Sequence, residues 1–255
     1  MTWKPLHSSN EPNHYSDFWR TRSEQYNKLE WANHQSFLDA FVQAGDFKET
    51  DIVLDVGTGT GIVAHAISPL VKQVIGLDKS QDMLEHSNWY DNMYFIKRDI
   101  LDPIFKEEVF DKVTTRQVFH HILDGTQEAM DECYRVLKKG GKMIFSDGVP
   151  PSEEVKEDYM AIFKLKEERL TFMDGDLIAL MERAGFRDIQ ISVLWLRQMS
   201  IKNWLINSGL PQSTQDEIFK LHVNAGDYFK EAYNLVENGG DCFIDMKMVI
   251  LLGEK

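Results

Sequence analysis

Apolar residues recur along the chain in short blocks that predict buried strands. In the block 52–56, Ile52, Val53, Leu54 and Val56 form an almost continuous apolar run. A strand of a parallel sheet has this composition because other elements cover both of its faces. Similar blocks predict strands at 74–77, 94–96, 112–115 and 142–147. We therefore predict an α/β fold with a mostly parallel sheet.

Polar stretches with apolar residues at intervals of three and four predict helices between these strands. The first helix begins near Tyr15 and places Trp19, Arg22 and Tyr26 on one face. Further helices are predicted at 33–44, 62–67, 126–137, 152–168 and 174–184, with a short one after the capping residue Ser80. Helices that follow strands in this way are typical of a doubly wound sheet.

The C-terminal part of the chain contains two more predicted strands, 189–196 and 242–252. Some 40 residues lie between them, with helical stretches near 201–206, 215–222 and 228–236. An insertion of this length is too long for a bare loop and is usually functional. We expect one domain, 1–255, made of an N-terminal helical cover (1–45), a core (46–198), a helical lid (199–240) and a last strand (241–255).

Composition narrows the classes of protein that this chain can represent. Hydrophobic residues make up 43% and charged residues 27% of the 255 residues, which is ordinary for a globular domain. The net charge of -13 argues against nucleic acid or an anionic membrane surface as partner. Two scattered cysteines, Cys133 and Cys242, and no apolar run that could span a bilayer lead us to expect a cytoplasmic protein. The oligomeric state is not readable from the sequence.

A glycine-rich turn follows the first strand, in the stretch Ile-Val-Leu-Asp-Val-Gly-Thr-Gly-Thr-Gly from Ile52 to Gly61. Glycines permit positive φ and let a ligand lie against bare backbone. The dinucleotide fingerprint Gly-x-Gly-x-x-Gly does not match, because one residue separates the second and third glycines. Asp55, two residues before Gly57, would repel a pyrophosphate and attract a cation.

A second carboxylate indicates that the ligand also contains a ribose. Asp78 stands 17 positions after Gly61, at the end of the predicted strand 74–77. A carboxylate in that place can accept both hydrogen bonds of a ribose diol. Ribose combined with positive charge suggests S-adenosylmethionine.

From about Asp51 to Asp147 the chain resembles the class I S-adenosylmethionine-dependent methyltransferases, in the small-molecule branch that includes quinone-biosynthesis methyltransferases. Five segments match in the family's order: the glycine loop, Gly-Leu-Asp-Lys-Ser-Gln-Asp-Met-Leu (76–84), Phe-Ile-Lys-Arg-Asp-Ile (95–100), Phe-Asp-Lys-Val (110–113) and Arg-Val-Leu-Lys-Lys-Gly-Gly (135–141). The resemblance implies a Rossmann-like, seven-stranded sheet whose last strand is antiparallel, with the helical lid added. It also implies methyl transfer to a small-molecule acceptor by in-line displacement.

The resemblance assigns residues to the cofactor. They are Tyr26, Asp55, Gly57, Thr58, Gly59, Gly61, Asp78, Lys79, Met83, Asp99, Ile100 and Arg116. In this assignment Asp99 binds the adenine amino group, the Ile100 amide donates to the ring, and Met83 packs on its face. Tyr26 reaches the methionine moiety. Core packing is the alternative for Met83 and Tyr26, and an exposed loop position is the alternative for Asp99.

Chemistry is expected where strand 112–115 delivers Arg116-Gln-Val-Phe-His-His121 to the carboxyl edge of the sheet. Adjacent histidines cannot share a face, so at most one of His120 and His121 should point at the substrate, where it could remove a proton. His121 matches the histidine often seen in the family that the chain resembles. A structural histidine bonded to backbone is the alternative. Asp147 has no neighbouring Asp and Asn residues suited to magnesium, and we expect a metal-independent enzyme.

Aromatic, histidine and arginine residues near the first helix and the lid are candidates for binding a flat or partly apolar acceptor. They are Trp19, Trp195, Arg197, Trp204, His222 and Tyr228, with core packing as the alternative for each. Two other functions remain open. One is a nicotinamide-dependent oxidoreductase, and the other is a catalytically silent cofactor-binding or regulatory subunit.

Overall fold

The computed structural model describes residues 14–87, 90–102 and 105–255, and the bounds of its elements follow. The strands are β1 (Ile52–Val56), β2 (Gln73–Asp78), β3 (Met93–Lys97), β4 (Phe110–Arg116), β5 (Leu137–Gly148), β6 (Arg187–Ser200), β7 (Val236–Asn238) and β8 (Asp241–Glu254). The α-helices are α1 (His14–Tyr26), α2 (Gln35–Gly45), α3 (Ile62–Ile67), α4 (Gln81–Glu85), α5 (Thr126–Val136), α6 (Lys156–Lys166), α7 (Asp174–Ala184), α8 (Ile201–Ile206), α9 (Gln212–Val223) and α10 (Asp227–Ala232). Short 3-10 helices are η1 (Trp31–Asn33), η2 (Ser68–Leu70), η3 (Phe119–His121) and η4 (Glu153–Val155).

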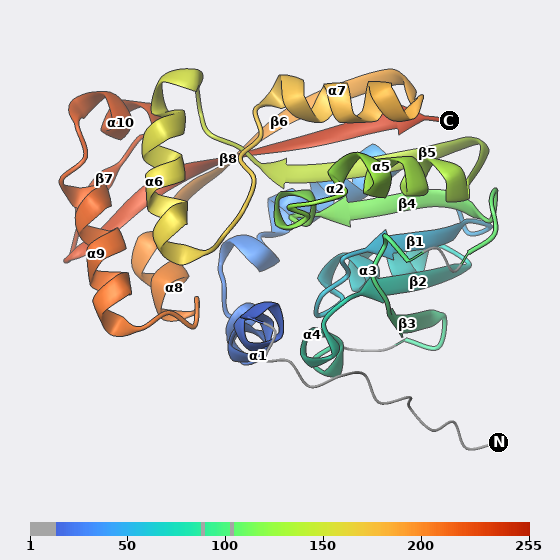
Figure 1. Ribbon diagram of the computed structural model, residues 1–255, viewed down its shortest axis with the longest axis horizontal. Coiled ribbons are helices and arrows are strands. Elements are labelled where there is room, and N and C mark those ends of the chain that lie inside the picture. Colours follow the sequence, from blue (N-terminus) through green and yellow to red (C-terminus); the bar gives the residue numbers. More distant parts are fainter. Residues whose placement is uncertain (1–13, 88–89, 103–104) are drawn as a thin grey trace.

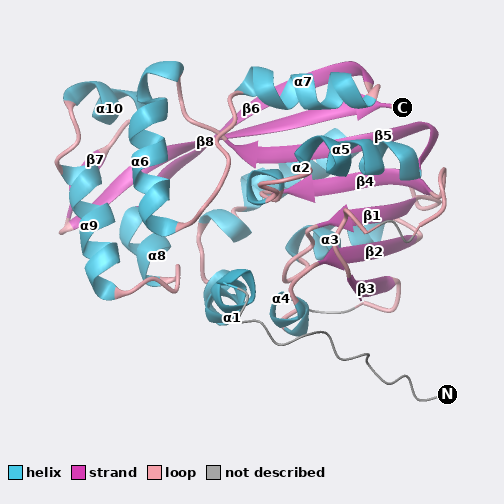
Figure 2. Cartoon of the chain, viewed as in Figure 1, coloured by secondary structure: helices cyan, strands magenta, loops and turns pink. Residues whose placement is uncertain are grey.

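The strands form one mixed sheet with the order β3-β2-β1-β4-β5-β8-β6 (Figures 1 and 2). Strands β1 to β5 pair in parallel, whereas β8 runs antiparallel to both β5 and β6. The predicted Rossmann-like α/β fold with an antiparallel last strand is therefore confirmed. The structure adds β7, a three-residue strand that pairs with β8. All three of its residues are exposed, so no apolar pattern marked it in the sequence.

Both faces of the central strands β1, β4 and β5 are largely buried, and successive residues of each strand point to opposite faces. On one face, Leu54 and Phe145 belong to a core that includes residues of α5 and α7. On the other face, Ile144 packs with Phe37 and Phe41 of α2. This two-sided burial explains why the parallel strands have continuous apolar sequences. No α-helix among the described residues has the length and hydropathy needed to cross a membrane.

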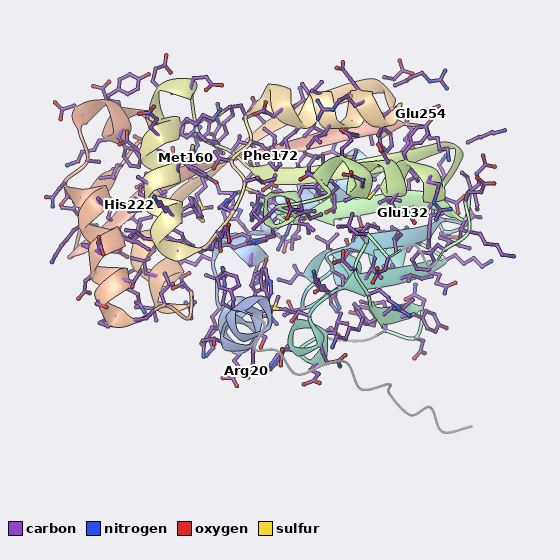
Figure 3. The ribbon with its side chains drawn as sticks, in the orientation of Figure 1. Arg20, Glu132, Met160, Phe172, His222 and Glu254 are labelled. Atoms are coloured by element: carbon purple, nitrogen blue, oxygen red, sulfur yellow. The ribbon has the colours of Figure 1, made fainter. Side chains whose placement is uncertain are left out.

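The predicted insertion folds into helices α8, α9 and α10 together with β7. The three helices pack with α6, which precedes β6 in the chain, around a separate apolar cluster that includes Tyr159, Ile218 and Phe229. We use the name lid for the predicted segment 199–240 together with α6, which the sequence analysis had placed in the core. Figure 1 shows it at the left, at one end of the long strands β6 and β8, with α1 between it and α4. Figure 3 shows the side chains packed between α6 and α9, with His222 labelled among them.

Candidate functional site

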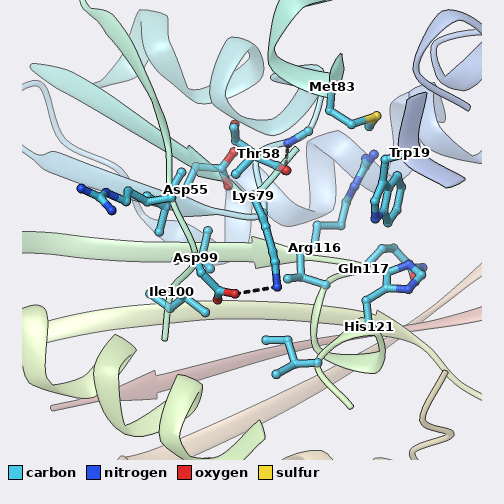
Figure 4. Close-up of a pocket in the computed structure, with 18 of the residues that line it drawn as sticks. Trp19, Asp55, Thr58, Lys79, Met83, Asp99, Ile100, Arg116, Gln117 and His121 are labelled. Carbon is cyan, nitrogen blue, oxygen red and sulfur yellow. Dashed lines mark hydrogen bonds and ion pairs between the residues drawn. The ribbon is translucent and has the colours of Figure 1, made fainter. Parts of the chain in front are cut away.

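A cavity of about 430 Å³ lies at the carboxyl ends of β1, β2 and β4 (Figure 4). A cavity of this size is within the usual range for a cofactor site. Eleven of the twelve residues predicted to contact a cofactor line it: Tyr26, Asp55, Gly57, Thr58, Gly59, Asp78, Lys79, Met83, Asp99, Ile100 and Arg116. The structure thus brings together residues from α1, the glycine turn, β2, α4 and the ends of β3 and β4.

The glycine turn adopts the conformation that its sequence predicts. Gly57, Gly59 and Gly61 have φ values of 64°, 56° and 78°. A Cβ at Gly57 would lie 2.2 Å from Val118 Cγ2, so a side chain there would also be blocked by packing. Gly61 is the exception among the predicted residues, because it does not line the cavity. It precedes α3, and a Cβ there would lie 3.0 Å from Phe95 Cζ, so its role is packing within the fold.

Asp55 leaves a carboxylate oxygen free at the base of the cavity. Its Oδ1 accepts a hydrogen bond from Thr114 Oγ1 at 2.7 Å, while Oδ2 has no partner among the described residues. The Thr58 hydroxyl also lines the cavity and interacts with Asp55. Burial raises the pKa of Asp55 to about 6, although Thr58 and Thr114 oppose this effect. A buried carboxylate at this position fits a ligand with an ammonium or sulfonium charge, because an uncompensated charge is costly to bury.

Asp78 links the glycine turn to the start of α4. Its Oδ2 accepts from the Gly59 amide and its Oδ1 from the Ser80 amide, both at 2.8 Å. Ser80 in turn accepts from the Met83 amide, as the predicted helix cap requires. The Lys79 amide is a third backbone donor to this carboxylate. A carboxylate has about four acceptor positions, so Asp78 can hold the turn and still accept a hydrogen bond from a ribose hydroxyl.

The far wall of the cavity carries the groups that the sequence assigned to a purine ring. Asp99 pairs with Lys79, with Nζ and Oδ2 2.8 Å apart, and both side chains retain solvent exposure. Ile100 and Met83 are buried and present apolar surface. Arg116 also lines the cavity, but its guanidinium donates to the Ala32 carbonyl at 2.8 Å. This bond holds η1 against β4, so positioning the chain is part of the role of Arg116.

A second cavity, of about 100 Å³, adjoins the first one on the side of the lid. Trp19, Tyr26, Gln117 and His121 line both cavities and form the junction between them. Among the residues predicted to bind an acceptor, Trp204 and His222 line the second cavity together with Trp19. The junction places a ligand of the second cavity beside a ligand of the first.

The other three residues predicted to bind an acceptor line neither cavity. The Arg197 side chain is 65% exposed and pairs with Asp245, and its guanidinium lies 5.6 Å from the ring of Trp195. Tyr228 is 53% exposed on the outer side of the lid. The sequence could not separate these residues from Trp204, because residue type alone does not give the direction of a side chain. None of the three contributes to the lining of either cavity.

His120 is oriented by a buried carboxylate. Its Nδ1 lies 2.7 Å from Asp147 Oδ1, and both side chains are at most 4% exposed. Burial lowers the pKa of His120 well below its ordinary value and raises that of Asp147 to about 6. At neutral pH, Nδ1 of the neutral imidazole donates to the Asp147 carboxylate, which can only accept. The Nε2 atom then carries a lone pair that can take up a proton.

His121 and Gln117 shape the junction. The His121 ring meets Trp19 edge to face, with 4.9 Å between centroids. Gln117 has a φ of 59°, which is uncommon for a residue with a side chain. When its amide is oriented with nitrogen toward Asp147, it donates to Oδ1 at 2.8 Å. Sequence reasoning did not single out Gln117, and its position directly after β4 was the available signal.

A buried group of charged residues on the lid side of the second cavity was also missed. Arg22, Lys166 and Arg169 surround the carboxylate of Glu167, and all four side chains are 3–6% exposed. The sequence predicted a helix at 152–168 and gave these residues no role in a site. In the structure α6 ends at Lys166, and Glu167 and Arg169, which follow it, are buried. Only Arg22 was anticipated, on the helix face shared with Trp19 and Tyr26.

Glu167, His120 and His121 could together be considered as metal ligands, since one ligand atom from each lies within 4.8 Å of the others. Both Glu167 oxygens, however, already contact cations: Arg22 and Lys166 at Oε2, and Arg169 at Oε1. A divalent cation here would lie beside three positive side chains. The electrostatic environment therefore favours an anion over a metal ion.

Comparison with known proteins gives the same family as the sequence motifs. A family model described as a methyltransferase domain matches residues 54–145. An uncharacterized methyltransferase of Bacillus subtilis, YcgJ, is 23% identical over 231 residues, covering 86% of this chain and 90% of that protein. Its crystal structure superposes with a TM-score of 0.78 over 87% of this chain and 99% of that one, at 23% identity.

Two other proteins that match this chain, one in sequence and one in fold, have named activities. A demethylmenaquinone methyltransferase of Clavibacter sepedonicus is 26% identical over 162 residues, covering 62% of this chain and 64% of that protein. Phosphoethanolamine N-methyltransferase 2 of Haemonchus contortus, solved with S-adenosylhomocysteine and with S-adenosylmethionine, has a TM-score of 0.65 at 20% identity. The superposition covers 95% of this chain and 60% of that enzyme, and it shows a shared fold.

Proposed function

We propose that this chain, a class I S-adenosylmethionine-dependent methyltransferase, methylates a small-molecule acceptor bound in the second cavity. The observation that carries the proposal is the junction of Trp19, Tyr26, Gln117 and His121, which belongs to both cavities. S-adenosylmethionine supplies a methyl group already activated on a positively charged sulfur. The cofactor would occupy the larger cavity and the acceptor the smaller one.

The main contribution of the protein is to hold the two ligands in line. Asp78 and the glycine turn fix the ribose end, and the free Asp55 oxygen attracts the positive end. Orientation of two reactants can lower a barrier by about 7–11 kcal/mol. The lid covers the acceptor side of the junction and excludes water from it. The reaction needs no metal in this proposal.

His120 is the residue we assign to proton removal. Its Nδ1 is held by Asp147, so Nε2 is the atom that accepts a proton from a hydroxyl or amine of the acceptor. The same arrangement of carboxylate and imidazole orients the base in other enzymes. His121 forms the wall of the junction beside Trp19. The acceptor nucleophile is accordingly one that carries a proton.

Replacement of Asp78 by asparagine is expected to weaken S-adenosylmethionine binding by about 10- to 100-fold, because bonds to a charged acceptor are lost. Isothermal titration calorimetry measures the change. Asp102→Asn, at an exposed position, is the matched control and should bind as the unmodified protein does. An unchanged dissociation constant for Asp78→Asn would contradict the assignment of Asp78 to the ribose of the cofactor.

Cofactor affinity is expected to depend on pH through Asp55. Its pKa of about 6 means that the carboxylate is charged at pH 7 and mostly protonated at pH 5. Binding of a cationic ligand should therefore weaken by about tenfold between pH 7 and pH 5. Asp78, whose pKa burial also raises, acts in the same direction. Calorimetry over this range tests the prediction, and Asp55→Asn should flatten the curve; a level curve for the unmodified protein contradicts it.

Two experiments separate this function from its alternatives. A thermal-shift comparison should show stabilisation by S-adenosylmethionine and none by NAD, whereas the opposite result would favour an oxidoreductase. Mass spectrometry of a metabolite extract incubated with the enzyme and methyl-labelled cofactor should show a labelled product. Binding of the cofactor without any labelled product would favour a silent cofactor-binding subunit. The relationship to demethylmenaquinone methyltransferase makes quinone precursors worth including.

A further inference from the structure

The polar wall of the second cavity is built from cations that come from separate elements. Arg22 projects from α1, Lys166 ends α6, and Arg169 follows it in the chain. We call these three residues the cation cluster. Their side chains are 4%, 4% and 6% exposed. Charges this deeply buried are unfavourable unless anions balance them.

The negative charge of the carboxylates around the cation cluster does not balance the positive charge of the cluster. Glu167 contacts all three cations, and Asp147 is the second buried carboxylate nearby. Burial and the neighbouring Arg22 lower the pKa of Lys166 to about 7, so Lys166 is only partly charged at neutral pH. When Lys166 is protonated, three cations against these two carboxylates leave one positive charge in excess, and a bound anion favours that form. The remaining charged residues on the lining are Glu30, which is exposed, and Lys247, which is paired with Asp174.

Arg22 also has an unused donor. One of its terminal nitrogens, Nη1, donates to Glu167 Oε2 at 2.8 Å, but Nε is buried with no partner among the described residues. A guanidinium presents its N–H groups in a plane that matches an oxyanion. The buried, unpaired donor therefore indicates a ligand that supplies an acceptor at this place.

Aromatic rings hold the cations and form the rest of the wall. Arg169 lies 4.3 Å from the ring of Phe163, and Lys166 lies 5.3 Å from the same ring. Trp204 and Tyr159 complete this apolar surface. Cation–π contacts fix the charged groups without neutralising them. The cavity thus offers one excess positive charge beside a flat apolar surface.

We propose that the acceptor is a monocarboxylate with an apolar, ring-sized body, and that its carboxylate binds the cation cluster. This inference rests on the proposed function and specifies the substrate class of the same site. A single bound carboxylate makes the net charge of the buried groups zero, whereas a phosphate dianion would make it negative. The ring lies against Phe163 and Trp204, and the part to be methylated points to the junction.

Ligand binding tests the inference apart from turnover. Benzoate is the probe, benzamide its neutral isostere and phenyl phosphate its dianionic counterpart. Each is titrated by calorimetry into the full chain saturated with S-adenosylhomocysteine. Benzoate should bind at least about tenfold more tightly than either analogue. Equal binding of benzoate and benzamide, no benzoate binding at millimolar concentration, or tighter binding of phenyl phosphate would overturn the proposal.

Variants of the cluster locate the binding site. Arg22→Gln should weaken benzoate binding by about 10- to 100-fold and leave S-adenosylhomocysteine binding unchanged. Arg20→Gln, an exposed position of the same helix, is the matched control. Arg169→Gln provides a second variant if Arg22→Gln does not fold. Unaltered benzoate affinity in a folded variant would contradict the assignment. If S-adenosylhomocysteine itself fails to bind the unmodified chain, that result contradicts the proposed function and not only the assignment of the acceptor.

Discussion

Glu167→Gln is expected to lower the free energy of unfolding by about 3–5 kcal/mol. The substitution keeps the shape of the side chain but removes the carboxylate that contacts Arg22, Lys166 and Arg169. These cations would then remain buried together, and breaking a buried pair leaves an uncompensated charge. Urea unfolding followed by circular dichroism at pH 7 measures the loss.

The control for this prediction uses the same substitution at a surface pair. Glu237 pairs with Lys230, and the two side chains are 49% and 32% exposed. Glu237→Gln should change stability by less than about 1 kcal/mol. A similarly small effect at Glu167 would show that the cation cluster does not depend on its carboxylate. Benzoate should restore part of the stability of Glu167→Gln, because it supplies a negative charge at the same place.

His120→Ala is expected to reduce kcat by about 10²- to 10⁴-fold, the range in which a positioned base contributes. The substitution removes the imidazole that Asp147 orients, while the residues of the larger cavity are untouched. Cofactor affinity should therefore stay unchanged. The measurement is turnover of methyl-labelled cofactor with the acceptor identified by the product screen, together with calorimetry of cofactor binding.

Companion variants show whether His120 acts as the base. Asp147→Asn should also lower kcat, because it removes the charge that fixes the Nδ1–H form of the imidazole. His86→Ala, at an exposed position, should have normal turnover. Full activity of a folded His120→Ala variant would reject the role. A loss confined to His121→Ala would transfer the role to the histidine at the junction.

The fold and the cofactor side of the site were predictable because their signals are local in the sequence. The continuous apolar run 52–56 indicates burial on both faces, and the structure places α5 on one face and α3 on the other. Gly57 and Gly59 need positive φ, so the turn appears directly in the sequence. Asp55 and Asp78 end adjacent parallel strands, and the register of β1 with β2 brings them to one edge. Each of these features requires only a strand and what immediately follows it.

The acceptor side was less predictable, because its residues meet only through the tertiary fold. Arg22 and Glu167 are 145 positions apart, and nothing in the local sequence marks them as a pair. The run 164–169 has the composition of a solvated helix end, and its burial depends on packing between α1 and the lid. Asp147 was noted at the end of its strand, but its contact with His120 depends on the path of η3. Similarly, Trp195 and Trp204 are alike in sequence, and only the fold separates them.

Calorimetric titration of the unmodified protein with S-adenosylmethionine is the decisive measurement for the cofactor site. We predict one site per chain, for which S-adenosylhomocysteine competes, which Asp78→Asn weakens and which NAD does not affect. Absence of binding at millimolar cofactor, or binding that Asp78→Asn leaves intact, would contradict this prediction.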